Sequence, residues 1–314
     1  MKPAALPPDL AARPFLVREA LPLTGSERLR RLDLCAPTRG VRAPPDTALT
    51  PAILRLVLGP SQFISHTTAA RLHGLPVPTR EQETLHVSTV GDGSVMRRAG
   101  VTGHRIAQDL AQVDSAGPVR ASTPAACWAE SATLLALDDL IVLGDAVIAR
   151  NRPGSVADLA ALVRLRAGRR RAGVLREALR LIREGSESPQ ETRLRLLIVR
   201  AGHPEPALNV PVLDSRGRSI GRPDLSYPEL RIGIEYEGDH HRTDVGTWRS
   251  DIRRRERFAA EGWRTLRVVA DDLTVHAQSF LTRLERARSV AAAERGATSR
   301  DRTRRRVGAP GGDD

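Results

Sequence analysis

A short segment near residue 230 alternates between apolar and polar positions, which predicts a β-strand because successive strand side chains point to opposite faces. One face carries Leu230, Ile232, Ile234 and Tyr236, and the other carries Arg231, Gly233, Glu235 and Glu237. Glu235 and Glu237 therefore point the same way, roughly 6–7 Å apart, given the ~3.3 Å rise per residue. A preceding strand from about Ser219 carries Asp224, and a hairpin would place Asp224 beside the two glutamates.

Helical patterns with starts and breaks occur through the rest of the chain. Helices are expected at 51–59, 66–74, 123–148, 156–168 and 189–202. Pro51 and Pro189 stand at first helical positions, and Ser155 and Ser188 precede helices as caps. Additional strands are expected at 84–89, 97–106 and 210–213.

Breaks in these patterns divide the chain, and its length favours two domains. We expect a disordered N-terminus at 1–22, an α+β region at 23–150, a basic helical linker at 151–185, an α/β domain at 186–290 and a disordered tail at 291–314.

Charge changes the picture of the partner. The formal net charge is +12, and the isoelectric point is about 11.2. Lys2 is the only lysine, so almost all of the positive charge comes from arginine. Replacement of lysine by arginine in a GC-rich genome would produce this bias. The net charge itself favours an anionic polymer or surface as partner.

Cysteines and hydropathy indicate the compartment. Cys35 and Cys127 are far apart and match no metal-binding or disulfide pattern, which fits a reducing cytoplasm. The first residues lack the apolar core of a signal peptide. The most apolar stretch, 134–148, is short and contains three aspartates, so no membrane span is expected.

The acidic residues Asp224, Glu235 and Glu237 carry the candidate chemistry. Crowded carboxylates raise the free energy of ionising one another, and a divalent metal is a common compensation. The pattern therefore suggests a hydrolase with a hard metal ion, and the basic composition suggests nucleic acid as substrate.

The run 221–242 resembles the PD-(D/E)XK nuclease superfamily. Pro223-Asp224 matches the first motif element, and Glu235-Tyr236-Glu237 matches the second. The following residues resemble the very-short-patch-repair-type nuclease domain of uncharacterised actinobacterial proteins: Gly238, His241, Trp248, Asp251, Arg254 and the GWR sequence at 262–264. The similarity covers about 186–273 and implies a restriction-endonuclease-like mixed sheet flanked by helices.

This resemblance implies hydrolysis of DNA phosphodiesters that depends on Mg²⁺ or Mn²⁺. Asp224 and Glu235 would be metal ligands, because carboxylate oxygens suit hard cations. Glu191 lies where some members of the fold place a further helix acid. His241 would serve as a general base or donate to the leaving group.

The chain departs from the motif at Glu237, which stands at the lysine position. Glu237 would then bind a second metal, or Arg231 or Arg254 would supply the missing positive charge.

Structural alternatives exist for these residues. Glu191, three residues after Ser188, also fits a capping box. Glu235 and Glu237 also fit the solvated face of an amphipathic strand, and Asp224 a turn at a strand edge. Asp251 and Arg254 also fit a surface ion pair on a helix.

The N-terminal region at about 25–150 resembles AbiEi-type antitoxins in its segments RLRRLDLCAPTRGVRAP and FISHTTAARLHGLPVP. This implies a winged-helix-like α+β region and leaves open a toxin partner. Arg39 and Arg42 flank a turn from which they could reach phosphates. The basic stretch 164–183, which includes Arg170 and Arg171, could follow a DNA backbone. His66 and His73 are interpreted as capping or packing residues.

Two functions remain open. The first is a cytoplasmic, Mg²⁺-dependent DNA endonuclease in repair or phage defence. The second is a DNA-binding regulator or antitoxin-like protein with an inactive nuclease fold. A third possibility is that RNA is the substrate, which the resemblance allows. Cutting both strands with one site per chain would favour a homodimer, whereas nicking needs only a monomer.

Overall fold

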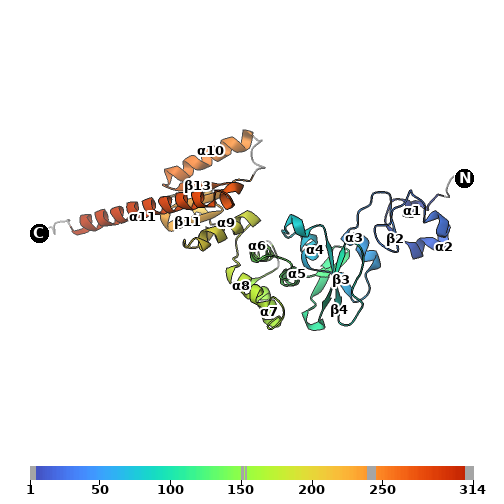
Figure 1. Cartoon of the computed structure of the whole chain (residues 1–314). Helices are drawn as coiled ribbons and strands as arrows, with labels where there is room; N and C mark the ends of the chain where they lie inside the picture. The colour runs from blue at the N-terminus through green and yellow to red at the C-terminus, as the bar shows by residue number, and fades with distance from the viewer. Residues whose placement is uncertain (1–4, 150–151, 153, 239–244, 308–314) are drawn as a thin grey trace. The chain divides into compact units, whose positions relative to one another are not determined.

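The chain divides into an N-terminal unit, Met1–Ile182, and a C-terminal unit, Arg183–Asp314. The computed structural model describes residues 5–149, 152, 154–238 and 245–307, and their side chains except at 245–252 and 297–307. Figure 1 shows the elements of each unit in order along the chain.

A five-stranded mixed sheet in the order β5-β4-β3-β7-β6 forms the centre of the N-terminal unit. Its strands are β3 (Gln62–Ile64), β4 (Leu85–Val90), β5 (Val101–Ile106), β6 (Val113–Ala116) and β7 (Val119–Ser122). β4 runs parallel to β5 and places Ser88 opposite His104. This register brings polar side chains of two strands together.

Helices pack against this sheet and one another. They are α3 (Pro51–Leu54), α4 (His66–Leu72), α5 (Pro124–Ser131), α6 (Leu137–Val147), α7 (Val156–Leu165) and α8 (Ala172–Leu181). The single helix expected at 123–148 is wrong, because the chain folds back between α5 and α6. The indole of Trp128 on α5 donates to the carbonyl of Leu140 on α6 at 3.0 Å and is fully buried by this reversal.

Two further segments differ from simple readings of the sequence. The stretch 151–185, expected as a linker, contains α7 and α8, which pack with α5 and α6 in the N-terminal unit. The first residues form α1 (Pro8–Ala11), β1 (Phe15–Leu16) and α2 (Val17–Arg28), and β1 pairs antiparallel with β2 (Val41–Arg42). Phe15 in β1 is fully buried, so part of the segment expected to be disordered packs into a small core.

The C-terminal unit contains a four-stranded mixed sheet in the order β13-β12-β11-β8. Its strands are β8 (Ala207–Leu208), β11 (Leu225–Tyr227), β12 (Ile232–Tyr236) and β13 (Arg264–Val268), and a hairpin of β9 (Val212–Leu213) and β10 (Ser219–Gly221) adjoins it. β12 runs antiparallel to β11 and parallel to β13.

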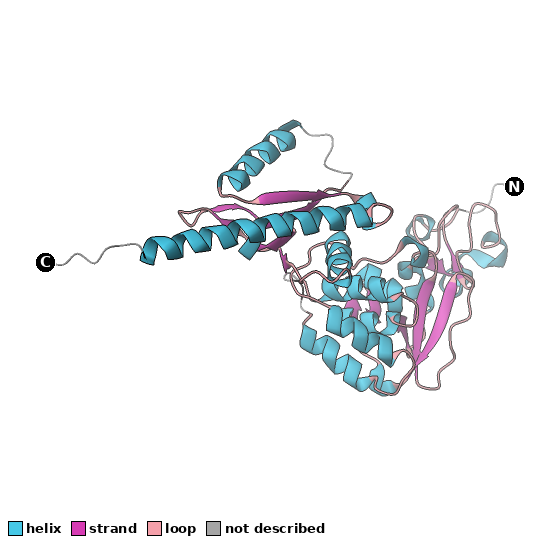
Figure 2. Cartoon of the chain, turned by 60° about the vertical axis from the view of Figure 1, so that its left-hand side comes forward, coloured by secondary structure: helices cyan, strands magenta, loops and turns pink. Residues whose placement is uncertain are grey.

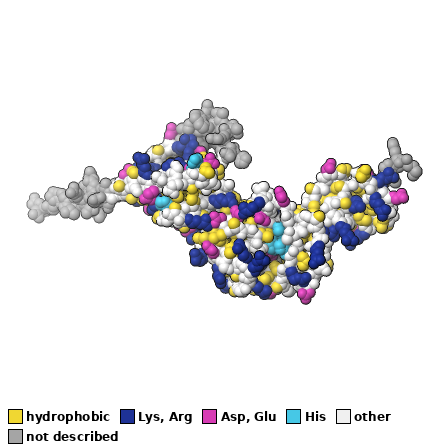
Figure 3. Space-filling view, viewed as in Figure 1, with side chains coloured by type: hydrophobic (Ala, Val, Ile, Leu, Met, Phe, Trp, Pro, Cys, Tyr) yellow, Lys and Arg dark blue, Asp and Glu magenta, His cyan; other side chains and the backbone are white. Residues whose placement is uncertain are grey.

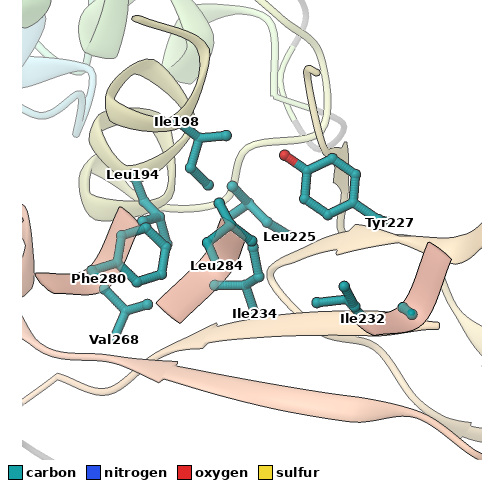
Figure 4. Packing of buried hydrophobic residues seen from close by; sticks show 10 residues of the cluster. Leu194, Ile198, Leu225, Tyr227, Ile232, Ile234, Val268, Phe280 and Leu284 are labelled. Carbon is teal, nitrogen blue, oxygen red and sulfur yellow. The ribbon is translucent and has the colours of Figure 1, made fainter. Parts of the chain in front are cut away.

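Helices α9 (Pro189–Arg200) and α11 (Ala277–Val307) cover the apolar face of this sheet. Figure 4 shows Leu194 and Ile198 of α9 and Leu284 of α11 directed toward Leu225 and Ile234 of the strands. Helix α10 (Val245–Ala260) lies on the opposite side of the sheet, as Figures 1 and 2 show. The polar face of β12 therefore faces α10.

The tail expected to be disordered from 291 continues as helix α11 to Val307. Among the residues that the structure describes, no helix combines the length and the apolar character needed to cross a membrane.

Candidate metal centre

Asp224 and Glu235 lie side by side on the face of the sheet toward α10. Leu225 pairs with Ile234 in the antiparallel ladder, so the next pair outward is Asp224 with Glu235. Directly opposed residues on one face have Cβ atoms about 4.5–5.5 Å apart. The hairpin predicted from the sequence thus brings these two carboxylates together.

The environment of Asp224 disfavours its charge. Burial raises the pKa of its carboxyl, and the charge of Glu235 raises it further. The opposing influences are the backbone N–H of Tyr236, which donates to Asp224 Oδ2 at 2.7 Å, and the charges of Arg254 and Arg222. A carboxylate held in this way is the kind of group that a cation would stabilise.

Glu191, in the first turn of α9, lies near Asp224. Ser188 caps the helix, because its Oγ accepts from the Glu191 N–H at 3.2 Å. The Glu191 side chain is buried and accepts from Glu187 N at 2.8 Å and from Asn209 Nδ2 at 2.7 Å. Burial raises the pKa of Glu191, and the charge of Asp224 adds to that rise.

Asn209 links the two carboxylates structurally. Its backbone N–H donates to the Asp224 carbonyl at 2.9 Å, while its side chain holds Glu191. Its φ of 50° lies in the left-handed region that asparagine tolerates better than most residues. Sequence reasoning missed Asn209, and its only signal was its place just before the expected strand at 210–213.

Arginines pair with Glu235 of β12 and with Glu237, which follows the strand. Arg254 Nη2 of α10 lies 2.6 Å from Glu235 Oε1, and Arg267 Nη1 of β13 lies 2.7 Å from Glu237 Oε1. Arg254 also donates to the Arg222 carbonyl and stacks over the Phe258 ring. Arg254 was predicted as a contributor of positive charge, whereas Arg267 was missed.

The signal for Arg267 was its place in β13. In the parallel ladder Arg267 pairs with Glu235, and therefore lies on the same face of the sheet as Glu237. The sequence alone does not reveal that Arg267 lies beside Glu235 and Glu237, because the pairing register of β12 and β13 is not known from it. Two guanidinium groups thus lie beside the two glutamates.

His241 lies outside the described residues, as do the side chains of Trp248 and Asp251. The arrangement of the predicted proton carrier is therefore not part of the observed site. Glu237 is about half exposed, and its backbone N–H donates to the Val268 carbonyl at 2.7 Å.

The described residues hold no cluster of three or more His, Cys, Asp or Glu side chains arranged around a common ion position. A pair of carboxylates still fits Mg²⁺, which is usually held by one or two carboxylates together with waters and substrate phosphates. The oxygen-only donors Asp224 and Glu235 fit this requirement, with Glu191 adjoining Asp224.

The arginines expected to bind DNA in the N-terminal unit differ in their surroundings. Arg42 donates from Nε to the Leu29 carbonyl at 2.6 Å, and Arg171 donates from Nε to the Ala132 carbonyl at 2.9 Å. Both guanidinium groups therefore support local structure. Arg39 and Arg170 are exposed.

No protein-family model matches the chain. The chain is similar to two uncharacterized proteins of Mycobacterium tuberculosis, one from strain CDC 1551 / Oshkosh and one from strain ATCC 25618 / H37Rv. Each is 26% identical over 231 residues, which cover 73% of this chain and 82% of the relative. The described structure is that of a mixed α/β protein in which helices flank several sheets.

Proposed function

We propose that the C-terminal unit is a metal-dependent nuclease that hydrolyses phosphodiester bonds of DNA. The observation that carries this proposal is the opposition of Asp224 and Glu235 across the β11–β12 ladder, with Glu191 buried beside Asp224. These acids come from a helix and two adjacent strands, in the order expected for a restriction-endonuclease-like fold. The strand order β13-β12-β11-β8 and the helices on both faces support the same fold.

Asp224 and Glu235 would hold Mg²⁺ or Mn²⁺. When bound, such an ion polarises a phosphate and lowers the pKa of a bound water. Arg254 and Arg267 provide cationic groups beside the acids, and either guanidinium can bind two phosphate oxygens in a fork. Hydrolysis joins the water oxygen to phosphorus, breaks the bond to the leaving sugar oxygen and transfers one proton to that oxygen.

Conversion of supercoiled plasmid to nicked or linear DNA tests this function. We expect wild type to convert the plasmid with Mg²⁺ or Mn²⁺ and not with EDTA. Asp224→Asn and Glu235→Gln should each lower the rate more than about 100-fold, since loss of a residue that merely hydrogen-bonds to a metal ligand typically has a 10–100-fold effect. Glu256→Gln, at an exposed position on α10, is the matched control and should cleave like wild type.

A second candidate function is a DNA-binding regulator whose nuclease fold does not cleave. The ion pairs of Glu235 with Arg254 and of Glu237 with Arg267 favour it, because they satisfy the acids without a metal. A winged-helix-like, AbiEi-related N-terminal region with a toxin partner belongs to this alternative. It predicts that Asp224→Asn binds a labelled duplex as wild type does and that no metal supports cleavage, whereas metal-dependent cleavage would exclude it.

Cleavage of labelled DNA and RNA of the same sequence, measured side by side, shows which of the two is the substrate. The proposal predicts faster cleavage of DNA duplex than of the RNA of equal sequence.

A further inference from the structure

A cavity of about 520 Å³ lies within the N-terminal unit, apart from the candidate metal centre. Strands β4 and β5 form one wall, α4 and α5 form another, and the residues that follow α7 form a third. Small-molecule sites commonly have volumes of about 300–1,000 Å³. The cavity is therefore large enough for a ligand of nucleotide size.

Buried polar atoms without partners among the described residues belong to side chains that line this cavity. They are Ser88 Oγ, Glu130 Oε1 and Arg166 Nη1. Each of these residues is less than 10% exposed. Leaving a buried donor or acceptor unpaired destabilises a protein, so three such atoms on the side chains of one cavity indicate a polar ligand that satisfies them.

Glu130 is held so that only one of its oxygens is engaged. Its Oε2 accepts from Ser122 Oγ at 2.7 Å and from the His66 N–H at 3.0 Å. These contacts fix the carboxylate and leave Oε1 as an acceptor for a ligand N–H or O–H. His66 has φ of 53°, which is uncommon for a residue other than glycine, and such strain often occurs beside functional groups.

The rest of the lining is strongly cationic. Its basic residues are Arg105, Arg166, Arg169 and Arg170, against the single carboxylate of Glu130. Arg169 approaches Asp109 only at 3.8 Å, and both side chains are exposed. Arg170 is exposed at the cavity. Guanidinium forks of this kind suit a phosphate group.

The neutral rings of His66 and His104 line the same cavity, and His86 contacts His104. The rings of His66 and His104 stack with centroids 3.8 Å apart, and His86 Nδ1 lies 2.9 Å from His104 Nε2. Burial and the neighbouring His104 lower the pKa of His86 to about 4, and burial lowers the pKa of His66 and His104. The rings are therefore uncharged at neutral pH.

An apolar surface adjoins these groups, because Ile106, Leu110 and Leu134 also line the cavity. Figure 3 shows histidine side chains reaching the surface of the N-terminal unit among basic and hydrophobic ones. An apolar wall beside flat rings suits a planar heterocycle. A nucleotide contains such a ring, whereas a sugar phosphate and inorganic phosphate do not.

We propose that this cavity binds a free nucleoside monophosphate, with the phosphate on Arg166 and Arg170 and a donor of the base on Glu130. The assignment does not depend on the nuclease proposal, because the described residues that line the cavity all belong to the N-terminal unit. It gives His66 a place in a binding wall, beyond the capping or packing expected from sequence.

Isothermal titration of the full chain tests this proposal. The probes are AMP, GMP, CMP and UMP, the four matching nucleosides and inorganic phosphate. We expect at least one monophosphate to bind one site per chain with Kd below about 1 mM, corresponding to roughly −4 kcal/mol. Its nucleoside and inorganic phosphate should each bind at least about 10-fold more weakly, since each lacks one of the two recognised parts.

Two variants and one control locate the site. Arg170 is exposed, so Arg170→Ala should fold normally while weakening monophosphate binding at least about 5-fold. Arg166→Met should weaken monophosphate binding at least about 10-fold. Arg164→Ala, exposed on α7 and outside the cavity lining, should bind as wild type does. Circular dichroism melting of each variant accompanies the titration.

The proposal is overturned by any of three results. These are no monophosphate binding below 1 mM, inorganic phosphate binding as tightly as the best monophosphate, or Arg170→Ala and Arg164→Ala having equal affinities.

Discussion

Asp224 combines two properties at the residue scale: its carboxyl is partly buried, and a second carboxylate stands directly opposite it. Both raise its pKa, and the N–H of Tyr236 and nearby arginines only partly offset them. In the folded protein Asp224 therefore binds a proton more tightly than in the unfolded chain. A raised pKa of this kind makes ionisation a source of instability as the pH increases.

The first prediction is that Asp224→Asn stabilises the protein in EDTA. An amide oxygen can still accept from Tyr236 N–H, while the charge that Glu235 opposes is removed. The native state retains the proton longer, so wild type loses stability relative to Asp224→Asn as the pH rises above the ordinary aspartate value of 3.8. Thermal melting between pH 4 and 7 should show a gap that widens with pH.

Asp214 is the matched control, because its shift has the opposite sign. Hydrogen bonds from Arg218 and Arg216 lower the pKa of this aspartate. Its stabilising contribution is present above the unfolded pKa and is lost as the pH falls, so Asp214→Asn should melt below wild type at pH 7. A gap for Asp224→Asn that is independent of pH, or has the opposite sign, would contradict the account.

The second prediction concerns Arg254, which stands beside Glu235. If its charge stabilises the reacting phosphate, Arg254→Gln should lower the single-turnover rate of DNA cleavage by about 10²–10³-fold, as loss of one preorganised donor does elsewhere. Arg253→Gln, exposed on the same helix, is the control and should retain the wild-type rate. Equal rates for both variants would remove Arg254 from the site.

At the element scale, the apolar alternation of β12 fixes which face of the sheet is buried. Ile232 and Ile234 are fully buried against α9 and α11, and this packing turns Glu235 toward α10. A shift of one residue in the register would exchange the faces, so burial of the apolar side also positions the acids. Core packing and site geometry are therefore coupled in this strand.

The third prediction tests that packing. Phe280 of α11 is fully buried in the core of the C-terminal unit, so Phe280→Ala should lower the free energy of unfolding by about 3–5 kcal/mol. Urea titration followed by circular dichroism measures the loss. Val275→Ala, at an exposed site, is the control and should unfold within about 0.5 kcal/mol of wild type. An equally small loss for Phe280→Ala would show that Phe280 is not part of the core.

Local signals predicted several of these elements. The alternation at 230–237 anticipated β12, and Ser188-Pro189 anticipated the start of α9. Both depend on neighbours in sequence, which periodicity and capping describe well. The helix at 123–148 was wrong because its reversal depends on burying Trp128 against α6, a contact that periodicity does not encode.

Residues joined by long-range pairing escaped prediction. Arg267 reaches the site only through the β12–β13 register, and Ser88 meets His104 only through β4–β5. Asn209 is held against Glu191 by side-chain contacts across 18 positions. Candidate carboxylates could therefore be named from the sequence, whereas their arginine partners and the histidine-lined cavity required the fold.

At the scale of the whole molecule, positive charge is the main constraint on partners. The formal net charge of +12 favours an anionic partner, and the one that we propose is DNA, bound through its phosphates. Its sources include exposed arginines in both units, among them Arg39 and Arg253. Binding of this kind releases counterions and depends strongly on salt.

The fourth prediction follows from that charge. Affinity for a labelled DNA duplex, measured by fluorescence anisotropy in EDTA, should fall by about 10³-fold or more between 50 and 200 mM salt if about six phosphates are contacted. Asp224→Asn should show the same slope, because it changes no phosphate-binding arginine. An affinity that does not change with salt would exclude phosphate contacts as the basis of binding.

The most direct test of the central claim is the location of Mn²⁺ by anomalous diffraction from crystals of the full chain soaked with the ion. The account predicts an anomalous peak bound by carboxylate oxygens of Asp224 and Glu235 in wild type, and its loss in Asp224→Asn. Wild-type crystals in which Arg254 remains paired with Glu235 and no peak forms between the two acids would contradict it.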